Sequence, residues 1–122
     1  MKILIVEDEQ ALADILHDEF VRAGSEVQMA YDGQEAIDVL KTSVPDVILL
    51  DLLLPKKDGF EVLGEMQKDE RLKAVPVVIL SNLAQDEDVK RGLSLGAKDY
   101  FVKTRLSLKE VVEKATKYAN KQ

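Results

Sequence analysis

The sequence predicts a single α/β domain in which a parallel sheet of five strands is covered by helices on both faces. Five short apolar runs alternate with five segments whose apolar residues recur every three or four positions. The runs are apolar at successive positions, which is typical of strands buried on both faces of a parallel sheet. With 122 residues the chain is long enough for one such domain and too short for two. The domain is expected to span residues 1–122.

The first half of the chain predicts three strands, with a helix after each of the first two. The first helix covers residues 10–23 and stops at Gly24. Asp32, with Glu35 three residues later, predicts the cap of the second helix. The three strands are residues 3–6, 27–31 and 47–50. The residues expected on the buried faces of the two helices are Leu12, Ile15, Leu16, Phe20 and Ala23, then Ala36, Ile37 and Leu40.

The second half continues the alternation with three helices and two strands. Asp58 and Glu61 predict the start of a third helix over residues 59–68. A fourth helix stops at Gly96, and a capping box that begins at Ser107 opens the last helix. The strands are residues 77–80 and 100–103. The residues expected to face the core are Phe60, Leu63 and Met66 of the third helix, then Leu108, Val111, Val112, Ala115 and Ala119 of the last.

Composition and charge exclude several classes of protein. The chain has no cysteine, which rules out disulfides, a dithiol redox centre and a thiolate zinc site. The formal net charge is −6, concentrated in the first part of the chain, so we expect no nucleic-acid binding by this domain. The apolar runs are far shorter than the ~20 residues of a membrane helix, and the N-terminus does not resemble a signal peptide. We therefore expect a cytoplasmic protein that does not contact a membrane.

Polar side chains follow four of the predicted strands, and Asp51 is the most informative of them. It interrupts an apolar stretch, where an ionised carboxylate without a partner is costly to bury. If the first and third strands are neighbours, about 4.8 Å apart, the carboxylates of Glu7, Asp8 and Asp51 converge. Such a cluster repels unless a cation is bound or a pKa rises. Oxygen ligands favour a hard divalent ion, of which Mg²⁺ fits best, and Lys103 offers a second positive charge.

Most of these residues also have a purely structural explanation when they are taken singly. Glu7 and Asp8 can be acids at a helix N-terminus, Ser81 can cap a helix and Lys103 can be a surface lysine. No helix begins at Asp51, so a capping role does not explain that residue. All of them lie at the edge of the predicted sheet where ligands bind in folds of this kind. The joint functional interpretation is therefore the stronger one.

With these residues in place, the sequence resembles the receiver domain of two-component response regulators along its whole length, close in size to the chemotaxis-type regulators. Glu7 and Asp8 match the acidic pair of that family, Asp51 its phosphoacceptor, Ser81 its hydroxyl switch residue and Lys103 its lysine. Further matching segments are Leu54-Pro55, Asp58-Gly59 and residues 96–100, which end at the switch aromatic Tyr100. The resemblance implies a flavodoxin-like fold with the strand order 2-1-3-4-5.

The resemblance also implies a chemistry. Asp51 would receive a phosphoryl group from a histidine kinase or a histidine phosphotransfer protein. Mg²⁺ would be held by Asp8, Asp51, the backbone carbonyl of Leu53 and, through water, Glu7. Lys103 would hold a phosphoryl oxygen. Such a domain is a signalling switch and not an enzyme, because it catalyses only its own phosphorylation and dephosphorylation.

The implied output is a change of surface. Ser81 and Tyr100 would respond to the phosphoryl group and alter the face formed by the fourth helix, the fifth strand and the last helix. A downstream protein would bind that face. The family resemblance further implies a monomer that can dimerise when phosphorylated.

Three positions depart from the family pattern. Thr104 stands where the family usually has a proline joined through a cis peptide. Since a cis bond before any other residue costs about 2.5–4 kcal/mol, we expect a trans bond here and a longer contact between Lys103 and Asp51. Asn82 replaces the usual small residue after the hydroxyl, and the first acid of the pair is Glu7.

Other classes of protein fit less well. A flavodoxin carries a hydroxyl-rich and glycine-rich phosphate loop after its first strand, where this chain has three acids, and a dinucleotide-binding domain carries GxGxxG there. A phosphatase of the haloacid dehalogenase type needs an acid two residues after its nucleophile, where this chain has Leu53. The remaining alternative is a pseudo-receiver, an interaction module that acts without phosphorylation.

Overall fold

A computed structural model of the protein describes residues 1–105 and 107–120. Five parallel strands form one sheet in the order β2-β1-β3-β4-β5, which confirms the predicted order. The strands are β1 (Lys2–Val6), β2 (Glu26–Ala30), β3 (Val47–Leu50), β4 (Val77–Ser81) and β5 (Asp99–Val102). The helices are α1 (Gln10–Arg22), α2 (Gly33–Thr42), α3 (Gly59–Gln67), α4 (Asp86–Ser94), the 3₁₀ helix η1 (Lys103–Arg105) and α5 (Leu108–Ala119). Among the described residues, no helix has the length and apolar character needed to cross a membrane.

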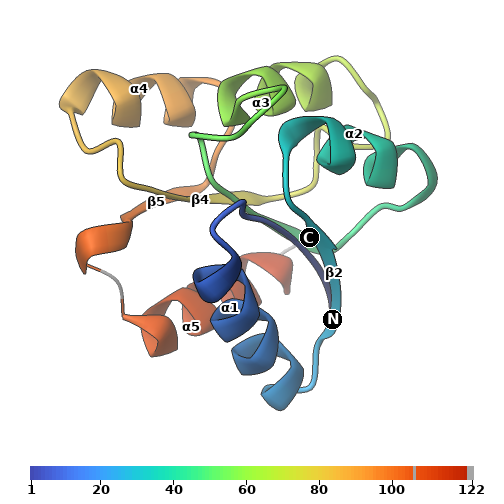
Figure 1. Ribbon diagram of the computed structural model, residues 1–122. Helices are drawn as coiled ribbons and strands as arrows, with labels where there is room; N and C mark the ends of the chain where they lie inside the picture. The colour runs from blue at the N-terminus through green and yellow to red at the C-terminus, as the bar shows by residue number, and fades with distance from the viewer. Residues whose placement is uncertain (106, 121–122) are drawn as a thin grey trace.

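The helices form two layers with the sheet between them. Helices α1 and α5 lie on one face, and α2, α3 and α4 lie on the other (Figure 1). Successive residues of a strand point to opposite faces, so Ile3 and Ile5 join the core under α1 and α5, while Leu4 and Val6 join the other core. This arrangement is the flavodoxin-like α/β fold, in which the residues that follow the parallel strands meet at the carboxyl edge of the sheet.

The burial of the strands depends on their position in the sheet. All residues of β3 and β4 are buried, and β1 is buried from Ile3 to Val6. The edge strands β2 and β5 are mostly half-buried, because each has a neighbour on one side only. The uninterrupted apolar runs in the sequence therefore identify the three central strands best.

Side-chain caps begin α2, α3 and α5 at Asp32, Asp58 and Ser107, and glycines follow α1 and α4, as the sequence predicts. Asp32 Oδ1 accepts a hydrogen bond of 2.7 Å from the Glu35 N–H at the start of α2. A complete capping box starts α3, formed by Asp58 and Glu61. Gly24, with φ +92°, follows α1 in the left-handed conformation that glycine adopts most easily.

The prediction for the buried face of α1 is partly wrong. Ile15 is 47% exposed and Ala23 is exposed, whereas Ala13, Leu16 and Phe20 are fully buried. These three residues lie at spacings of three and four, which places them on one side of the helix. The small side chain of Ala13 allows α1 to approach the sheet, and Ile15 lies outside the contact.

Candidate functional site

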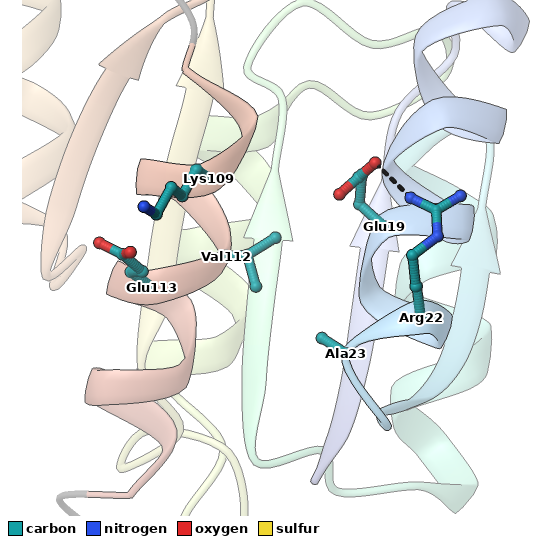
Figure 2. Close-up of a pocket in the computed structure, with 6 residues that line it drawn as sticks. All are labelled: Glu19, Arg22, Ala23, Lys109, Val112 and Glu113. Carbon is teal, nitrogen blue, oxygen red and sulfur yellow. Dashed lines mark hydrogen bonds and ion pairs between the residues drawn. The ribbon is translucent and has the colours of Figure 1, made fainter.

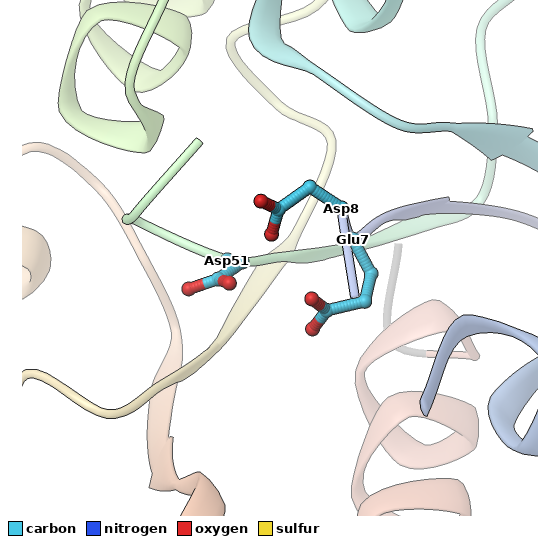
Figure 3. Close-up of side chains that lie close together, drawn as sticks. All are labelled: Glu7, Asp8 and Asp51. Atoms are coloured by element: carbon cyan, nitrogen blue, oxygen red, sulfur yellow. The ribbon is translucent and has the colours of Figure 1, made fainter. Parts of the chain in front are cut away.

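Glu7, Asp8 and Asp51 meet at the carboxyl ends of two neighbouring strands. Strands β1 and β3 pair in parallel with Val6 opposite Leu50, so the residues that follow both strands emerge at the same edge. One carboxylate oxygen from each acid lies within 4.8 Å of the other two. Figure 3 shows the three side chains gathered at this edge. The structure thus brings together the three acids that the sequence placed at one edge of the sheet.

The three acids differ in their access to solvent. Glu7 is 1% exposed and Asp51 is 3% exposed, whereas Asp8 is exposed. Backbone N–H groups hold the two buried carboxylates: Glu9 N–H donates to Glu7 Oε2 at 3.0 Å, and Leu53 N–H donates to Asp51 Oδ1 at 3.2 Å. The orientations of the two buried acids are therefore set by their own loops, and the cluster opens to solvent at Asp8.

Lys103 places its ammonium group between the two buried acids. Its Nζ lies 2.8 Å from Asp51 Oδ2, 2.9 Å from Glu7 Oε1 and 3.6 Å from Glu9 Oε2. The lysine side chain is itself only 10% exposed. The ammonium group of Lys103 therefore stabilises the buried carboxylates of Asp51 and Glu7. A carboxylate buried without such a partner would destabilise the fold.

The peptide bond between Lys103 and Thr104 is trans, as expected. The expectation of a long contact between Lys103 and Asp51 is wrong, because 2.8 Å is a short charge-assisted hydrogen bond. The backbone turns into the 3₁₀ helix η1 directly after β5, and Lys103 is the first residue of that turn. The turn and the long lysine side chain together carry Nζ to Asp51 without a cis bond.

The electrostatics of the cluster follow from burial and from this ion pair. Burial raises the pKa of the Glu7 carboxyl, and the charge of Asp51 adds to the increase, while hydrogen bonds from Lys103 and Glu9 oppose it. Burial alone lowers the pKa of the Lys103 ammonium, but hydrogen bonds to Asp51 and Glu7 outweigh burial and raise that pKa overall. Lys103 is therefore a permanent positive charge in the site at neutral pH.

The donor set suits a hard divalent cation. Mg²⁺ binds oxygen at about 2.0–2.1 Å, so two ligands on opposite sides of the ion lie about 4.2 Å apart. One oxygen from each of Glu7, Asp8 and Asp51 already lies within 4.8 Å of the other two, which is close to the separation of ligands around one such ion. Exposure at Asp8 also leaves space for the waters that Mg²⁺ retains.

Ser81 is the last residue of β4 and is completely buried. Helix α4 begins five residues later at Asp86, with Gln85 as its N-cap, so Ser81 does not cap this helix. Instead its Oγ accepts a hydrogen bond of 3.3 Å from the Leu83 N–H. The capping explanation for Ser81 is therefore wrong, and the hydroxyl lies at the same carboxyl edge as the acids.

Tyr100 contacts the same loop from β5. Its hydroxyl donates to the Leu83 carbonyl at 2.5 Å, so Leu83 is bonded through its backbone to both Ser81 and Tyr100. Burial, followed by the charges of Asp88 and Asp51, raises the pKa of Tyr100 to about 12. Sequence reasoning does not reveal this link, because both contacts use the backbone of Leu83.

Gly92 of α4 lies against Tyr100 as well. A Cβ at this position would lie 2.6 Å from Ile79 Cδ1 and 3.5 Å from the Tyr100 ring. The glycine therefore allows α4 to approach β4 and β5 closely. Gly92 is the only buried residue of α4, and Asp88 and Val89 of the same helix are half-buried.

Two surface cavities lie near α1. One, of about 360 Å³, opens beside the acidic cluster and is lined by Glu9, Ala11, Leu12, Ile15, Asn82, Lys103 and Thr104. The other, of about 290 Å³, lies between α1 and α5 (Figure 2). It is lined by Glu19, Arg22, Ala23, Lys109, Val112 and Glu113. Within it Arg22 and Glu19 form an ion pair at 2.7 Å. The second cavity shares no residue with the acidic cluster.

The fold and the site together define a doubly wound α/β domain that carries three acids and a lysine at the carboxyl edge of its sheet. The family model of the response regulator receiver domain matches residues 3–116, and the chain belongs to this family. It is similar to the receiver domain of the Francisella response regulator 1452, with 30% identity over 98% of this chain and 97% of that one and a TM-score of 0.91.

Two further response regulators of known structure are similar to this chain. One is the phosphorylated cyanobacterial phytochrome response regulator RcpA, with 35% identity over 95% of this chain and 89% of that one and a TM-score of 0.82. The other is the Mn²⁺-bound form of response regulator Rcp1, with 33% identity over the same shares of the two chains and a TM-score of 0.80.

Proposed function

We propose that Asp51 is the phosphoacceptor of this receiver domain and takes a phosphoryl group from a histidine kinase or a histidine phosphotransfer protein. The observation that carries the proposal is a carboxylate that is 3% exposed, lies 2.8 Å from Lys103 Nζ and shares its pocket with two further acids. A charge buried with such partners is costly to assemble and is typical of a reactive site. The phosphorylated state of the similar protein RcpA supports the same chemistry.

In the proposed reaction an Asp51 oxygen forms a bond to phosphorus while the bond from phosphorus to the donor's imidazole nitrogen breaks. The nitrogen leaves with the electron pair of that bond. Glu7, Asp8, Asp51 and the Leu53 carbonyl would hold Mg²⁺, which would supply positive charge for the phosphoryl oxygens. Lys103 already reaches the acceptor oxygen and is placed to hold a phosphoryl oxygen in the product. The Mn²⁺-bound relative Rcp1 supports a divalent ion at this site.

The proposed switch begins at Ser81. A phosphoryl group on Asp51 adds charge and strong acceptor oxygens, and the Ser81 hydroxyl is free to donate, because in the hydrogen bond with Leu83 it is the acceptor. Moving the loop that contains Leu83 also moves the acceptor of the Tyr100 hydroxyl. Tyr100 packs against α4, so the response reaches the face formed by α4, β5 and α5.

That face would bind the downstream protein. Its exposed basic side chains, Lys90, Arg91, Lys98 and Lys109, suit an acidic surface on the partner. Arg91 is the most constrained of them, because its guanidinium lies 4.0 Å from the centre of the Phe60 ring of α3.

Intact mass spectrometry after incubation with Mg²⁺ and acetyl phosphate tests the proposal. Wild type should gain one phosphate, and Asp51→Asn should gain none. Asp46→Asn is the matched control, because Asp46 lies just before β3 at the opposite end of the same strand, and it should be phosphorylated like wild type. Wild type that stays unmodified would favour the pseudo-receiver, and a gain that persists in Asp51→Asn would assign the phosphate to another residue.

A further inference from the structure

The first turn of α2 contacts the loop that follows Asp51. Gly33, the first residue of α2, is buried, and its N–H donates to the Pro55 carbonyl at 3.3 Å. A Cβ on Gly33 would lie 1.9 Å from the Lys57 carbonyl oxygen and 2.7 Å from Lys57 Cβ. Gly33 does not have a positive φ, so its backbone conformation is open to alanine. Glycine is therefore required at position 33 because a side chain would have no room, and not because of the backbone conformation.

The segment that Gly33 contacts is a γ-turn centred on Lys56. Lys57 N–H donates to the Pro55 carbonyl at 2.8 Å, and Lys56 has φ +68°. Within residues 1–105 and 107–120, no other residue except glycine has a positive φ. A left-handed lysine is strained and persists only where surrounding contacts hold it. Here the Gly33 N–H binds the Pro55 carbonyl, and Asp32 Oδ2 lies 3.5 Å from Lys56 Nζ.

The other side of this loop is tied to Asp51. Leu53 N–H donates to Asp51 Oδ1, and Gly59 N–H donates to the Leu52 carbonyl at 2.9 Å. A Cβ on Gly59 would lie 2.4 Å from the Asp51 carbonyl oxygen, so the loop returns tightly onto its own beginning. Only Leu54 separates Leu53 from the residue that starts the γ-turn. A displacement of the turn is therefore transmitted to the backbone of Leu53.

We propose that Gly33 and Asp32 are positioning residues for the metal site, because they hold the γ-turn and thereby set the place of the Leu53 carbonyl. This inference rests on the proposed function, which assigns that carbonyl to the Mg²⁺ ligands. Both residues act through the loop and neither is a ligand. Helix α2 thus contributes to the acidic site although none of its side chains belongs to the cluster.

The substitution Gly33→Ala tests the inference. Alanine can adopt the backbone conformation of Gly33, but its methyl group would press against Lys57 and displace the γ-turn. The dissociation constant for Mg²⁺, measured by calorimetry well below the melting temperature, should rise by about tenfold, as for other residues that position metal ligands. Phosphorylation by acetyl phosphate should fall at limiting Mg²⁺ and approach the wild-type rate at saturating Mg²⁺, because Asp51 and Lys103 are unchanged. Both measurements are made well below the melting temperature, where the variant is folded, so a loss of stability does not change the apparent Mg²⁺ affinity.

Gly64→Ala is the matched control, because a Cβ on Gly64 of α3 would meet no atom within 4 Å, and its Mg²⁺ affinity should equal that of wild type. If Gly33→Ala does not fold, Pro55→Ala loosens the turn without adding an atom and should weaken Mg²⁺ binding by about two- to fivefold. Wild-type Mg²⁺ affinity in a folded Gly33→Ala, or in Pro55→Ala when that variant is used, would overturn the positioning role. Wild type that neither binds Mg²⁺ nor accepts phosphate would instead overturn the proposed function.

Discussion

Lys103 Nζ and Asp51 Oδ2 lie 2.8 Å apart although the two residues follow strands that are separated in the sheet by β4. The same ammonium group also binds Glu7, so one positive charge compensates two buried carboxylates. This pairing lowers the cost of burying the two acids side by side. It also places a positive charge beside the proposed acceptor oxygen.

Removing this positive charge should destabilise the protein strongly. Lys103→Met leaves Glu7 and Asp51 buried without their partner, a change that typically costs about 3–5 kcal/mol. Denaturant unfolding in the presence of a chelator measures the loss, and added Mg²⁺ should restore part of it. Lys98→Met removes an exposed lysine and should be nearly neutral. Equal stability of the two variants would contradict the central role of the ion pair.

Neutralising the exposed acid should have the opposite effect on stability. Asp8 shares the cluster with two other carboxylates, so Asp8→Asn should raise the melting temperature in chelator by relieving repulsion. The same variant should lose most of the stabilisation that Mg²⁺ gives to wild type. At Asp51 the gain should be smaller, because asparagine there also loses the ion pair with Lys103. A lower melting temperature for Asp8→Asn in chelator would count against the cluster.

Tyr100 should make the stability fall at high pH. Burial and the charges of Asp88 and Asp51 raise the pKa of its hydroxyl from 10.0 to about 12. Between these values the folded state keeps a proton that the unfolded state has lost, so the stability decreases as the pH rises and is unaffected at lower pH. The melting temperature of Tyr100→Phe should therefore fall less steeply over this window. Parallel curves for the two proteins would refute the assignment.

The proposed aspartyl phosphate should be long-lived. Leu53 and Leu83 are tied by their N–H groups to Asp51 and Ser81, and both side chains are apolar, so neither can orient an attacking water. Leu53→Asn combined with Leu83→Glu should speed hydrolysis, and phosphate release after removal of the donor measures the rate. A wild-type lifetime of seconds, or no acceleration in the double variant, would show that Leu53 and Leu83 do not protect the aspartyl phosphate from water.

The sheet and the acidic cluster could be predicted because they depend on simple rules. Central parallel strands are apolar at every position, and residues that follow such strands meet at one edge. The same rules place Glu7, Asp8 and Asp51 together without any knowledge of side-chain geometry. The prediction that Ile15 lies in the core is wrong, because periodicity defines a helical face but not how far that face extends.

Contacts that depend on the exact path of a loop, or on backbone groups, could not be predicted. The reach of Lys103 to Asp51 depends on the turn at η1, and the exclusion of a side chain at Gly33 depends on how closely the loop approaches α2. The link from Ser81 to Tyr100 uses the backbone of Leu83, which carries no sequence signal. These relationships are set by packing in three dimensions.

Identifying the residue that carries the phosphate tests most directly whether Asp51 is the phosphoacceptor. Borohydride reduces an aspartyl phosphate to homoserine, so treatment after phosphorylation followed by peptide sequencing in a mass spectrometer marks the acceptor. We expect homoserine at position 51 in wild type, only when Mg²⁺ and the phosphodonor are both present. Homoserine at another position, or its absence under these conditions, would contradict the assignment of Asp51 as the phosphoacceptor.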